Sequence, residues 1–141
     1  MKVLYPDIVN NSKLLVSHFG SWPSFIDCEV ISITLNRELR NDLKGPTVDI
    51  SFYVYELGPA PELGQLNGAS ALFRFYGAED VNISEFNHQN QFDDLLVEPF
   101  YSERLKRNRF KIHFDGFGAN VTFTCDEIEI LSVEPYTPPD Y

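Results

Sequence analysis

The stretch TVDISFYVYE, residues 47–56, decides the fold because apolar side chains recur in it at every second position. The apolar set consists of Val48, Ile50, Phe52 and Val54. The alternate set is mainly polar and includes Asp49, Tyr53 and Tyr55. Successive side chains of an extended chain point to opposite faces, so this period predicts a strand with one face in a core and one towards water.

Similar segments lie on both sides of this strand and are separated by turn residues. These further strands are predicted at residues 25–37, 69–76, 80–86, 92–98, 109–115, 119–125 and 127–133. In the first of them we expect Ile31, Ile33 and Leu35 to share one face. The sequence DGFG at residues 115–118 predicts a hairpin turn between the strands beside it. A series of short strands with such turns predicts an antiparallel, mainly β domain.

One short helix is predicted before the strands, in SKLLVSHF at residues 12–19, with Asn10 or Asn11 as its cap and Gly20 at its end. A chain of 141 residues is most simply one domain, residues 1–141. The predicted fold class is therefore mainly β, with antiparallel sheets that are sandwich-like or strongly curved. Residues 57–68 form the longest predicted loop, and the proline-rich residues 134–141 are predicted to be a loose C-terminal tail.

The chain is acidic, with 11 Lys and Arg residues against 21 Asp and Glu residues and a formal net charge of −10. Such a charge repels nucleic-acid phosphates and anionic membranes and favours basic partners, so we expect no nucleic-acid or membrane partner. The basic residues between Arg104 and Lys111 are expected on a solvated loop and strand. No apolar run approaches the roughly 20 residues of a membrane span, and the N-terminus lacks a signal-peptide pattern, which predicts a cytoplasmic protein.

The sequence lacks the motifs of common catalytic and metal sites. Its three histidines do not have metal-ligand spacing, and neither a phosphate-binding glycine loop nor a nucleophile motif occurs. We therefore predict no metal, no cofactor and no catalytic residue. Cys28 and Cys125 have no CxxC spacing and are expected to be buried thiols.

Two polar groups are candidates for a binding site. Asp27 and Glu29 are two positions apart on a predicted strand, so their carboxylates should share a face. Such a pair can do acid–base chemistry or bind a cation, although it is also common on the polar face of a strand. The cluster FNHQN, residues 86–90, is either a polar recognition loop around His88 or a tight turn in which Asn87 and Asn90 bond nearby backbone.

Two aromatic residues are further candidates, and each has two interpretations. Trp22 either covers one end of the core with its indole N–H on a carbonyl, or serves as an exposed anchor for a partner. The neighbouring Gly20 and Pro23 fit a fixed corner, which favours the first interpretation. Tyr55 shares the polar face of its strand with Tyr53, either as ordinary cross-strand packing or as a binding surface.

Four segments in a fixed order carry a family resemblance: FGSWPSFIDCEV, PTVDISFYVYE, LFRFYGAEDVNISEFNHQN and TFTCDEIEILSVEP. Together they resemble the bacterial immunity protein 50 family over about Leu14 to Pro135. The positions that match the family pattern are Trp22, Pro23, Phe25, Asp27, Glu29, Val30, Phe86, Asn87, Gln89 and Asn90. One departure is Ile26, which stands where the pattern has a histidine, so an activity that depends on that histidine would be lost here.

The resemblance implies a β-rich, cytoplasmic, non-enzymatic protein of a polymorphic toxin system that binds and neutralises a cognate bacterial toxin. A basic nuclease domain would suit the acidic charge of this chain. The residues expected to bind the partner are Trp22, Asp27, Glu29, Tyr55, Asn87 and His88. The alternative is a small-ligand-binding protein or enzyme that uses Asp27, Glu29 and the loop of His88, which requires these residues to meet in one pocket.

Overall fold

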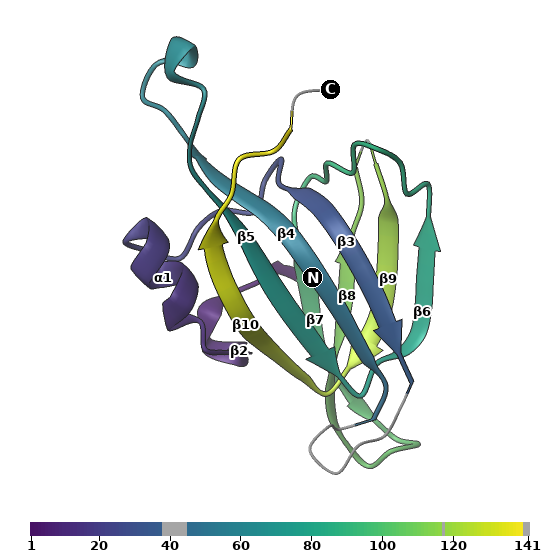
Figure 1. Ribbon diagram of the computed structural model, residues 1–141. Coiled ribbons are helices and arrows are strands. Elements are labelled where there is room, and N and C mark those ends of the chain that lie inside the picture. Colours follow the sequence, from purple (N-terminus) through teal and green to yellow (C-terminus); the bar gives the residue numbers. More distant parts are fainter. Residues whose placement is uncertain (38–44, 117, 140–141) are drawn as a thin grey trace.

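The computed structural model describes residues 1–37, 45–116 and 118–139, and within them two five-stranded sheets lie face to face (Figure 1). The first sheet has the order β1 (Lys2–Val3), β7 (Leu96–Ser102), β8 (Arg107–Phe114), β9 (Asn120–Cys125) and β6 (Glu79–Ser84). The second sheet has the order β2 (Val9–Asn10), β10 (Glu127–Pro135), β5 (Gln65–Tyr76), β4 (Thr47–Leu57) and β3 (Glu29–Asn36). Neighbouring strands are antiparallel except β2 and β10, which are parallel. The predicted mainly β, sandwich-like class is confirmed.

The alternation in β4 positions the core. The apolar set Val48, Ile50, Phe52 and Val54 is buried, each side chain being at most 1% exposed. Tyr53 and Tyr55 belong to the opposite set and lie on the outer face, where Tyr53 packs against Tyr55 with ring centroids 5.1 Å apart. The period of two in the sequence therefore gives both the buried face and the outer face of this strand.

Aromatic rings join the two sheets. Phe52 of the second sheet meets Phe114 of the first edge-on, with ring centroids 5.8 Å apart. Phe75 and Phe123 make a second edge-on contact between the sheets, at 4.9 Å. Edge-to-face pairs of this kind add to the free energy of burying the rings. The predicted buried thiols are confirmed, because Cys28 and Cys125 are 1% and 0% exposed, and burial raises the pKa of Cys28 to about 12.

Strand β7 begins four residues later than predicted, at Leu96 instead of Phe92. It also continues through Pro99 to Ser102, whereas the predicted strand ended at Glu98. Proline cannot donate to a ladder, but β1 pairs only with Leu96 and Val97, so the edge beside Pro99 needs no donor. Phe92 is buried in the core although it lies outside every strand.

Strand β3 is shorter than predicted and contains a bulge. The register with β4 shifts between Val30 and Ser32, so Ile31 does not share a face with Ile33 and Leu35 as expected. Val30 points to the core instead and is 1% exposed. The expectation that Asp27 lies on this strand is wrong, because the strand begins at Glu29. Asp27 lies before it in a left-handed turn with φ 62°.

The helix α1 (Lys13–Phe19) is present as predicted and ends at Gly20, whose left-handed φ of 83° lets its N–H bond to the carbonyl of Val16. The predicted cap is wrong, because the N-cap is Ser12 and no side chain caps the helix. The side chain of Asn11 donates instead to Glu129 and to the carbonyl of Ile130. These bonds hold the start of the helix against β10.

Short 3₁₀ helices, η1 (Pro6–Ile8) and η2 (Pro61–Leu63), complete the elements of the described residues. None of the helices in these residues is both long and apolar enough to cross a membrane. η2 lies at the tip of the hairpin of β4 and β5. Residues 57–68 were predicted to be a loop, but β4 ends only at Leu57 and β5 already begins at Gln65. The hairpin therefore extends as an arm beyond the sandwich (Figure 1).

The two remaining turn and tail predictions fall partly outside the described residues. Strands β8 and β9 pair as a hairpin on either side of DGFG, but Phe117 of this turn lies outside the described residues. In the segment predicted as a tail, Glu134 and Pro135 belong to β10, and the N–H of Tyr136 donates to the carbonyl of Gly68. Residues 140–141 are again outside the described part.

Phe52 is the ring on which a stability test should focus, because it contacts both Phe73 and Phe114. Phe52→Ala should lower the free energy of unfolding by about 3–5 kcal/mol, since it removes a fully buried ring and leaves a cavity. Phe86→Ala is the matched control, because Phe86 is 48% exposed and its loss should cost less than about 1 kcal/mol. Urea denaturation measures both. Equal losses would contradict the assignment of Phe52 to the core.

Candidate functional site

The segment Asn90–Phe92 belongs to the connection between β6 and β7, lies between the start of β3 and the β8–β9 turn, and holds the loop before it in place. On one side it bonds to the start of the second sheet, through backbone bonds with Asp27, Cys28 and Val30 of 3.0–3.1 Å. On the other side its Gln91 carbonyl accepts the N–H of Gly118 at 3.1 Å. The segment is therefore fixed from both sheets, although it belongs to no strand.

The glycines of the DGFG turn allow this segment to approach closely. A Cβ on Gly118 would lie 2.8 Å from the carbonyl oxygen of Gln89 and closer still to the backbone of Asn90. A Cβ on Gly116 would lie 2.6 Å from the Cα of Phe92. The sequence predicted these glycines only as turn residues, whereas their lack of a side chain is also needed for packing.

The FNHQN cluster forms the tight turn that was one of its two interpretations. The Asn90 side chain accepts the N–H of Asn87 at 2.7 Å and donates to the carbonyl of Asn87 at 2.6 Å. The N–H of Asn90 donates to the carboxylate of Glu29 at 3.1 Å. Asn90 is 3% exposed, whereas Asn87 and His88 are on the surface. The turn therefore presents Asn87 and His88 while Asn90 holds it.

A pocket of about 250 Å³ lies beside this turn, and we call it the tyrosine pocket. Its lining residues are Asp27, Glu29, Tyr53, Tyr55, Gln65, Gln89, Gln91, Pro138 and Pro139. Two of these described lining residues are charged, and both, Asp27 and Glu29, carry carboxylates. The pocket therefore combines negative charge, two phenol rings and three amides.

A second pocket of about 220 Å³ adjoins it and shares Glu29, Tyr53, Pro138 and Pro139 with it. Its lining also includes Asn87 and His88. We call the two pockets together the groove. Five of the six residues predicted to bind a partner line this groove, namely Asp27, Glu29, Tyr55, Asn87 and His88.

The tyrosines of the groove act as hydrogen-bond donors. The Tyr55 hydroxyl donates to the backbone carbonyl of Asp27 at 2.9 Å, and the Tyr53 hydroxyl donates to Gln65 at 2.8 Å. Burial raises the pKa of both tyrosines above the ordinary value, and electrostatic repulsion from the nearby Cys28 adds to this effect. Both phenols therefore stay protonated at neutral pH, and the groove gains no further negative charge from them.

Trp22 is the sixth predicted residue, and it does not line the groove. Its indole N–H donates to the carbonyl of Leu4 at 3.1 Å, and its ring meets Phe25 edge-on at 5.6 Å. It is half-buried and packs against the core. This geometry is the structural interpretation of Trp22, which covers one end of the core; binding of a partner by Trp22 stays a prediction.

Sequence reasoning did not assign the other walls of the groove. Gln65 lies in the predicted loop of residues 57–68, and Gln91 directly precedes a predicted strand. Pro138 and Pro139 belong to the predicted tail. One signal was available for the tail, because Gly68 has no side chain where Tyr136 and Tyr53 pass. A Cβ there would lie 2.6 Å from the carbonyl oxygen of Tyr136.

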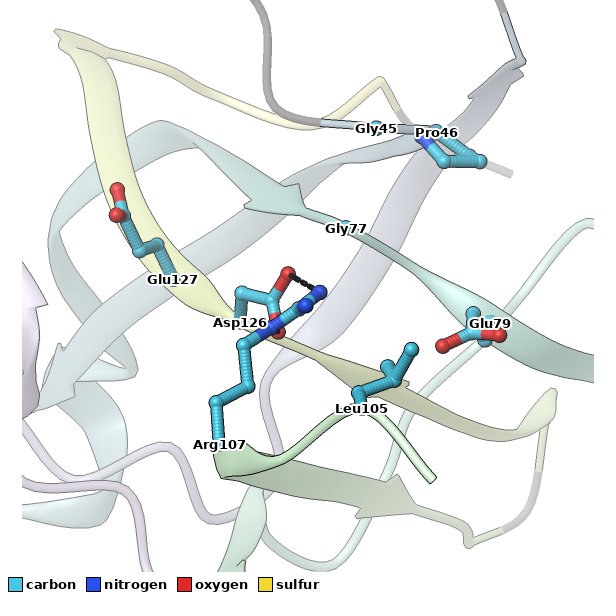
Figure 2. Close-up of a pocket in the computed structure, with 8 residues that line it drawn as sticks. All are labelled: Gly45, Pro46, Gly77, Glu79, Leu105, Arg107, Asp126 and Glu127. Carbon is cyan, nitrogen blue, oxygen red and sulfur yellow. Dashed lines mark hydrogen bonds and ion pairs between the residues drawn. The ribbon is translucent and has the colours of Figure 1, made fainter. Parts of the chain in front are cut away.

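A larger pocket of about 560 Å³ lies where the chain crosses between the sheets, near Gly77 and Asp126 (Figure 2). Arg107 and Asp126, drawn in the figure, form a two-bonded ion pair at 2.8 and 2.9 Å. Arg109 pairs with Asp126 at 2.8 Å and with Glu79 at 2.9 Å, and it also donates to the carbonyl of Gly77. Arg107, Asp126 and Glu79 of this pocket are thus paired with charged residues of the protein itself.

This network corrects, for Arg109 alone, the expectation that the basic stretch from Arg104 to Lys111 is solvated; its other four basic residues are exposed, as expected. Arg109 is only 3% exposed, and Arg104 pairs with Glu79 at 2.7 Å. Burial acts to raise the pKa of Asp126, but hydrogen bonds from Arg107 and Arg109 outweigh it and hold the pKa below its ordinary value. We interpret this pocket as structural.

A family model described as Immunity protein 50 matches residues 11–136, which is most of the chain. The chain belongs to the immunity protein 50 family. No curated protein and no solved structure matches the chain significantly. Membership in an immunity protein family implies, in general terms, a toxin as partner.

The range matched by the immunity protein 50 family includes most of the groove. Asp27, Glu29, Tyr55 and the turn of residues 86–90 lie inside it, whereas Pro138 and Pro139 lie beyond its end. Ile26, which stands where the resemblance led us to expect a histidine, is 58% exposed and directly precedes Asp27. Among the residues that the structure describes, no group of three His, Cys, Asp or Glu side chains could hold a metal.

Gly118→Ala tests the close approach that fixes the groove. The added methyl group would meet backbone atoms of the segment 89–92, which cannot move aside as a flexible side chain can. We expect a loss of about 1–3 kcal/mol in the free energy of unfolding, from overpacking. Amide signals of residues 87–92 should shift in NMR spectra. Gly64→Ala is the control for a glycine replaced without a clash, because a Cβ there meets nothing within 4 Å; its φ of 61° means that this variant loses stability through backbone strain alone. It should leave those signals unchanged, and a shift of equal size would contradict the assignment.

Asp126→Asn tests the ion network through its pH dependence. Because the pKa of Asp126 is lowered in the folded protein, its contribution to stability is present above the ordinary aspartate pKa of about 3.9. That contribution is lost as the pH falls through the lower folded value. The variant should therefore be about 2–3 kcal/mol less stable at neutral pH, with a smaller difference below about pH 3. Denaturation at several pH values measures this.

Asp7→Asn serves as the control for that series, because Asp7 is an exposed carboxylate outside the network. It should keep the pH profile of the wild-type protein. A stability difference for Asp126→Asn that is the same at every pH would argue against the pairing with Arg107 and Arg109.

Proposed function

We propose that this member of the immunity protein 50 family binds a cognate bacterial toxin and neutralises it by covering the toxin's active site or an adjacent surface. The inhibition is non-enzymatic and depends on one tight complex. The observation that carries this proposal is the groove, in which Asp27, Glu29 and Tyr55 are gathered beside the turn of Asn87 and His88. Family membership supplies the class of partner.

Charge supports a basic partner for this surface. The chain carries a formal net charge of −10, and both charged residues that line the tyrosine pocket are carboxylates. The resulting field attracts cationic surfaces and accelerates association with them. A toxin with a cationic substrate groove, such as a nuclease domain, would fit. The encounter takes place in the cytoplasm in this proposal.

The groove would form the centre of a larger interface. A stable complex buries roughly 800 Å² on each partner, more than the groove alone provides. Tyrosines at the centre of such an interface contribute strongly, because they are large, amphipathic and conformationally restricted. Tyr55 is already held by its hydrogen bond to the Asp27 carbonyl, so it would lose little conformational freedom on binding, and the buried Tyr53 supports its ring from behind.

The test uses the toxin encoded beside this gene in its native genome. Bacteria that express the toxin should grow only when this protein is co-expressed, and the purified pair should co-elute as one complex. In a titration, toxin activity should fall linearly and reach zero near one equivalent of this protein. Rescue by far less than one equivalent would indicate turnover and overturn the proposal. Absence of both binding and rescue would also overturn it.

A further inference from the structure

The arm formed by residues 56–66 at the end of the β4–β5 hairpin is held in a fixed shape (Figure 1). The N–H of Gly58 donates to the carbonyl of Gly64 at 2.9 Å, and the N–H of Leu63 donates to the carbonyl of Ala60 at 3.0 Å. Two prolines, at positions 59 and 61, further restrict its backbone. The arm therefore presents its side chains without a large ordering cost on binding.

Three leucines are exposed on this arm. Leu57 is 75% exposed, Leu63 is 51% exposed and Leu66 is 37% exposed. Leu63 and Leu66 both lie against Gly58, where a Cβ would be 2.5 Å from the Leu63 Cβ and 3.4 Å from the end of the Leu66 side chain. Neighbouring apolar side chains held in water on a projecting element are typical of an interaction surface.

The arm is continuous with the groove. Leu57 pairs in register with Gln65, and cross-strand partners lie on the same face of a sheet. Gln65 in turn lines the tyrosine pocket and accepts the hydroxyl of Tyr53. The most exposed leucine of the arm therefore lies next to a wall of the pocket, and apolar and anionic surfaces adjoin.

We infer that the arm and the groove form one docking surface for the cognate toxin, in which the leucines cover an apolar patch and the tyrosine pocket receives a lysine or arginine side chain. The inference rests on the proposed function. The pocket, at about 250 Å³, is smaller than the usual 300–1,000 Å³ of a small-molecule site and suits a single side chain.

The chemistry of the pocket selects a cation. The carboxylate of Asp27 is exposed at its rim, and the partly exposed ring of Tyr55 offers a face to which an ammonium or guanidinium group is attracted. The partner segment that fits this surface carries a basic residue beside an apolar one. A second copy of this chain fits less well, because it would bring the same negative groove against this one.

The experiment measures binding of the purified toxin encoded by the neighbouring gene, at several salt concentrations. Leu57→Ser should weaken binding at least tenfold through faster dissociation, with the salt dependence unchanged, because only apolar contact is lost. Asp27→Asn should slow association and reduce the salt dependence. Asparagine tolerates the left-handed backbone of position 27, and the bonds that Tyr55 and Gln91 make there go to its carbonyl oxygen.

Matched controls separate this surface from general effects. Leu35 is 56% exposed and pairs with Val48, nine positions from Leu57 along β4, so Leu35→Ser should bind within twofold of wild type. Asp7→Asn should do the same. Leu63→Ser gives a second test of the arm, and urea denaturation confirms that each variant is folded.

The outcomes distinguish this inference from the proposed function. If the wild-type protein binds the toxin and Leu57→Ser and Leu63→Ser bind equally well, the docking surface is overturned and the proposed function stands. If the wild-type protein fails to bind, both are overturned. If the wild-type protein is a dimer in sedimentation experiments and Leu57→Ser is a monomer, the arm forms the contact between two copies of this chain, and the inference is overturned.

Discussion

The backbone bonds of the segment Asn90–Phe92 are the constraint on which the rest of the site depends. The segment is bonded to the start of the second sheet through Cys28 and Val30, and to the turn between β8 and β9 of the first sheet through Gly118. Phe92 at its end enters the core and meets Phe52 and Phe114 at 5.7 and 5.1 Å. Burial of this ring therefore fixes, through a few backbone bonds, the position of the turn that forms one wall of the groove.

Two different interactions hold the two sheets together at their ends. At the groove, the connection between β6 and β7 of the first sheet is joined to the second sheet by backbone bonds, and glycines permit the close approach. Where the chain passes from one sheet to the other, near Gly77 and Asp126, Arg109 and Asp126 form a buried ion network that includes the carbonyl of Gly77. A buried pair of this kind contributes little net stability but is costly to break, so it favours one arrangement of the crossings over others.

Local patterns in the sequence predict local structure well in this protein. The alternation in TVDISFYVYE identifies the buried face of β4, and Gly20 correctly marks the end of α1. The failures occur where a distant segment decides the outcome. Pro99 is tolerated in β7 because β1 is short, and Arg109 is buried because Asp126, Glu79 and Gly77 surround it. Neither condition is visible in the residues next to the position concerned.

The groove shows the same division between local and distant information. The carboxylates, Tyr55 and the FNHQN turn were chosen as candidates by residue type, but nothing local indicates that Glu29 bonds to the backbone of Asn90, 61 positions away. The tail residues Pro138 and Pro139 were taken as loose, although the hydrogen bond between Tyr136 and Gly68 sets the course of the chain before them.

Much of the docking surface lies outside the phenylalanine core, although the buried Val30 and Tyr53 also line the groove. Asp27 lies in a turn, Asn87 and His88 in a loop, Gln65 on the arm beside Leu57, and Pro138 in the last described residues. Substitutions at these positions leave the interior untouched, so they carry little folding penalty. Lineages of such a protein can therefore change which partner they recognise through a handful of surface replacements, while the scaffold is inherited intact. A protein in competition with a diversifying adversary gains from this separation, because its evolution is not slowed by the need to repack a core.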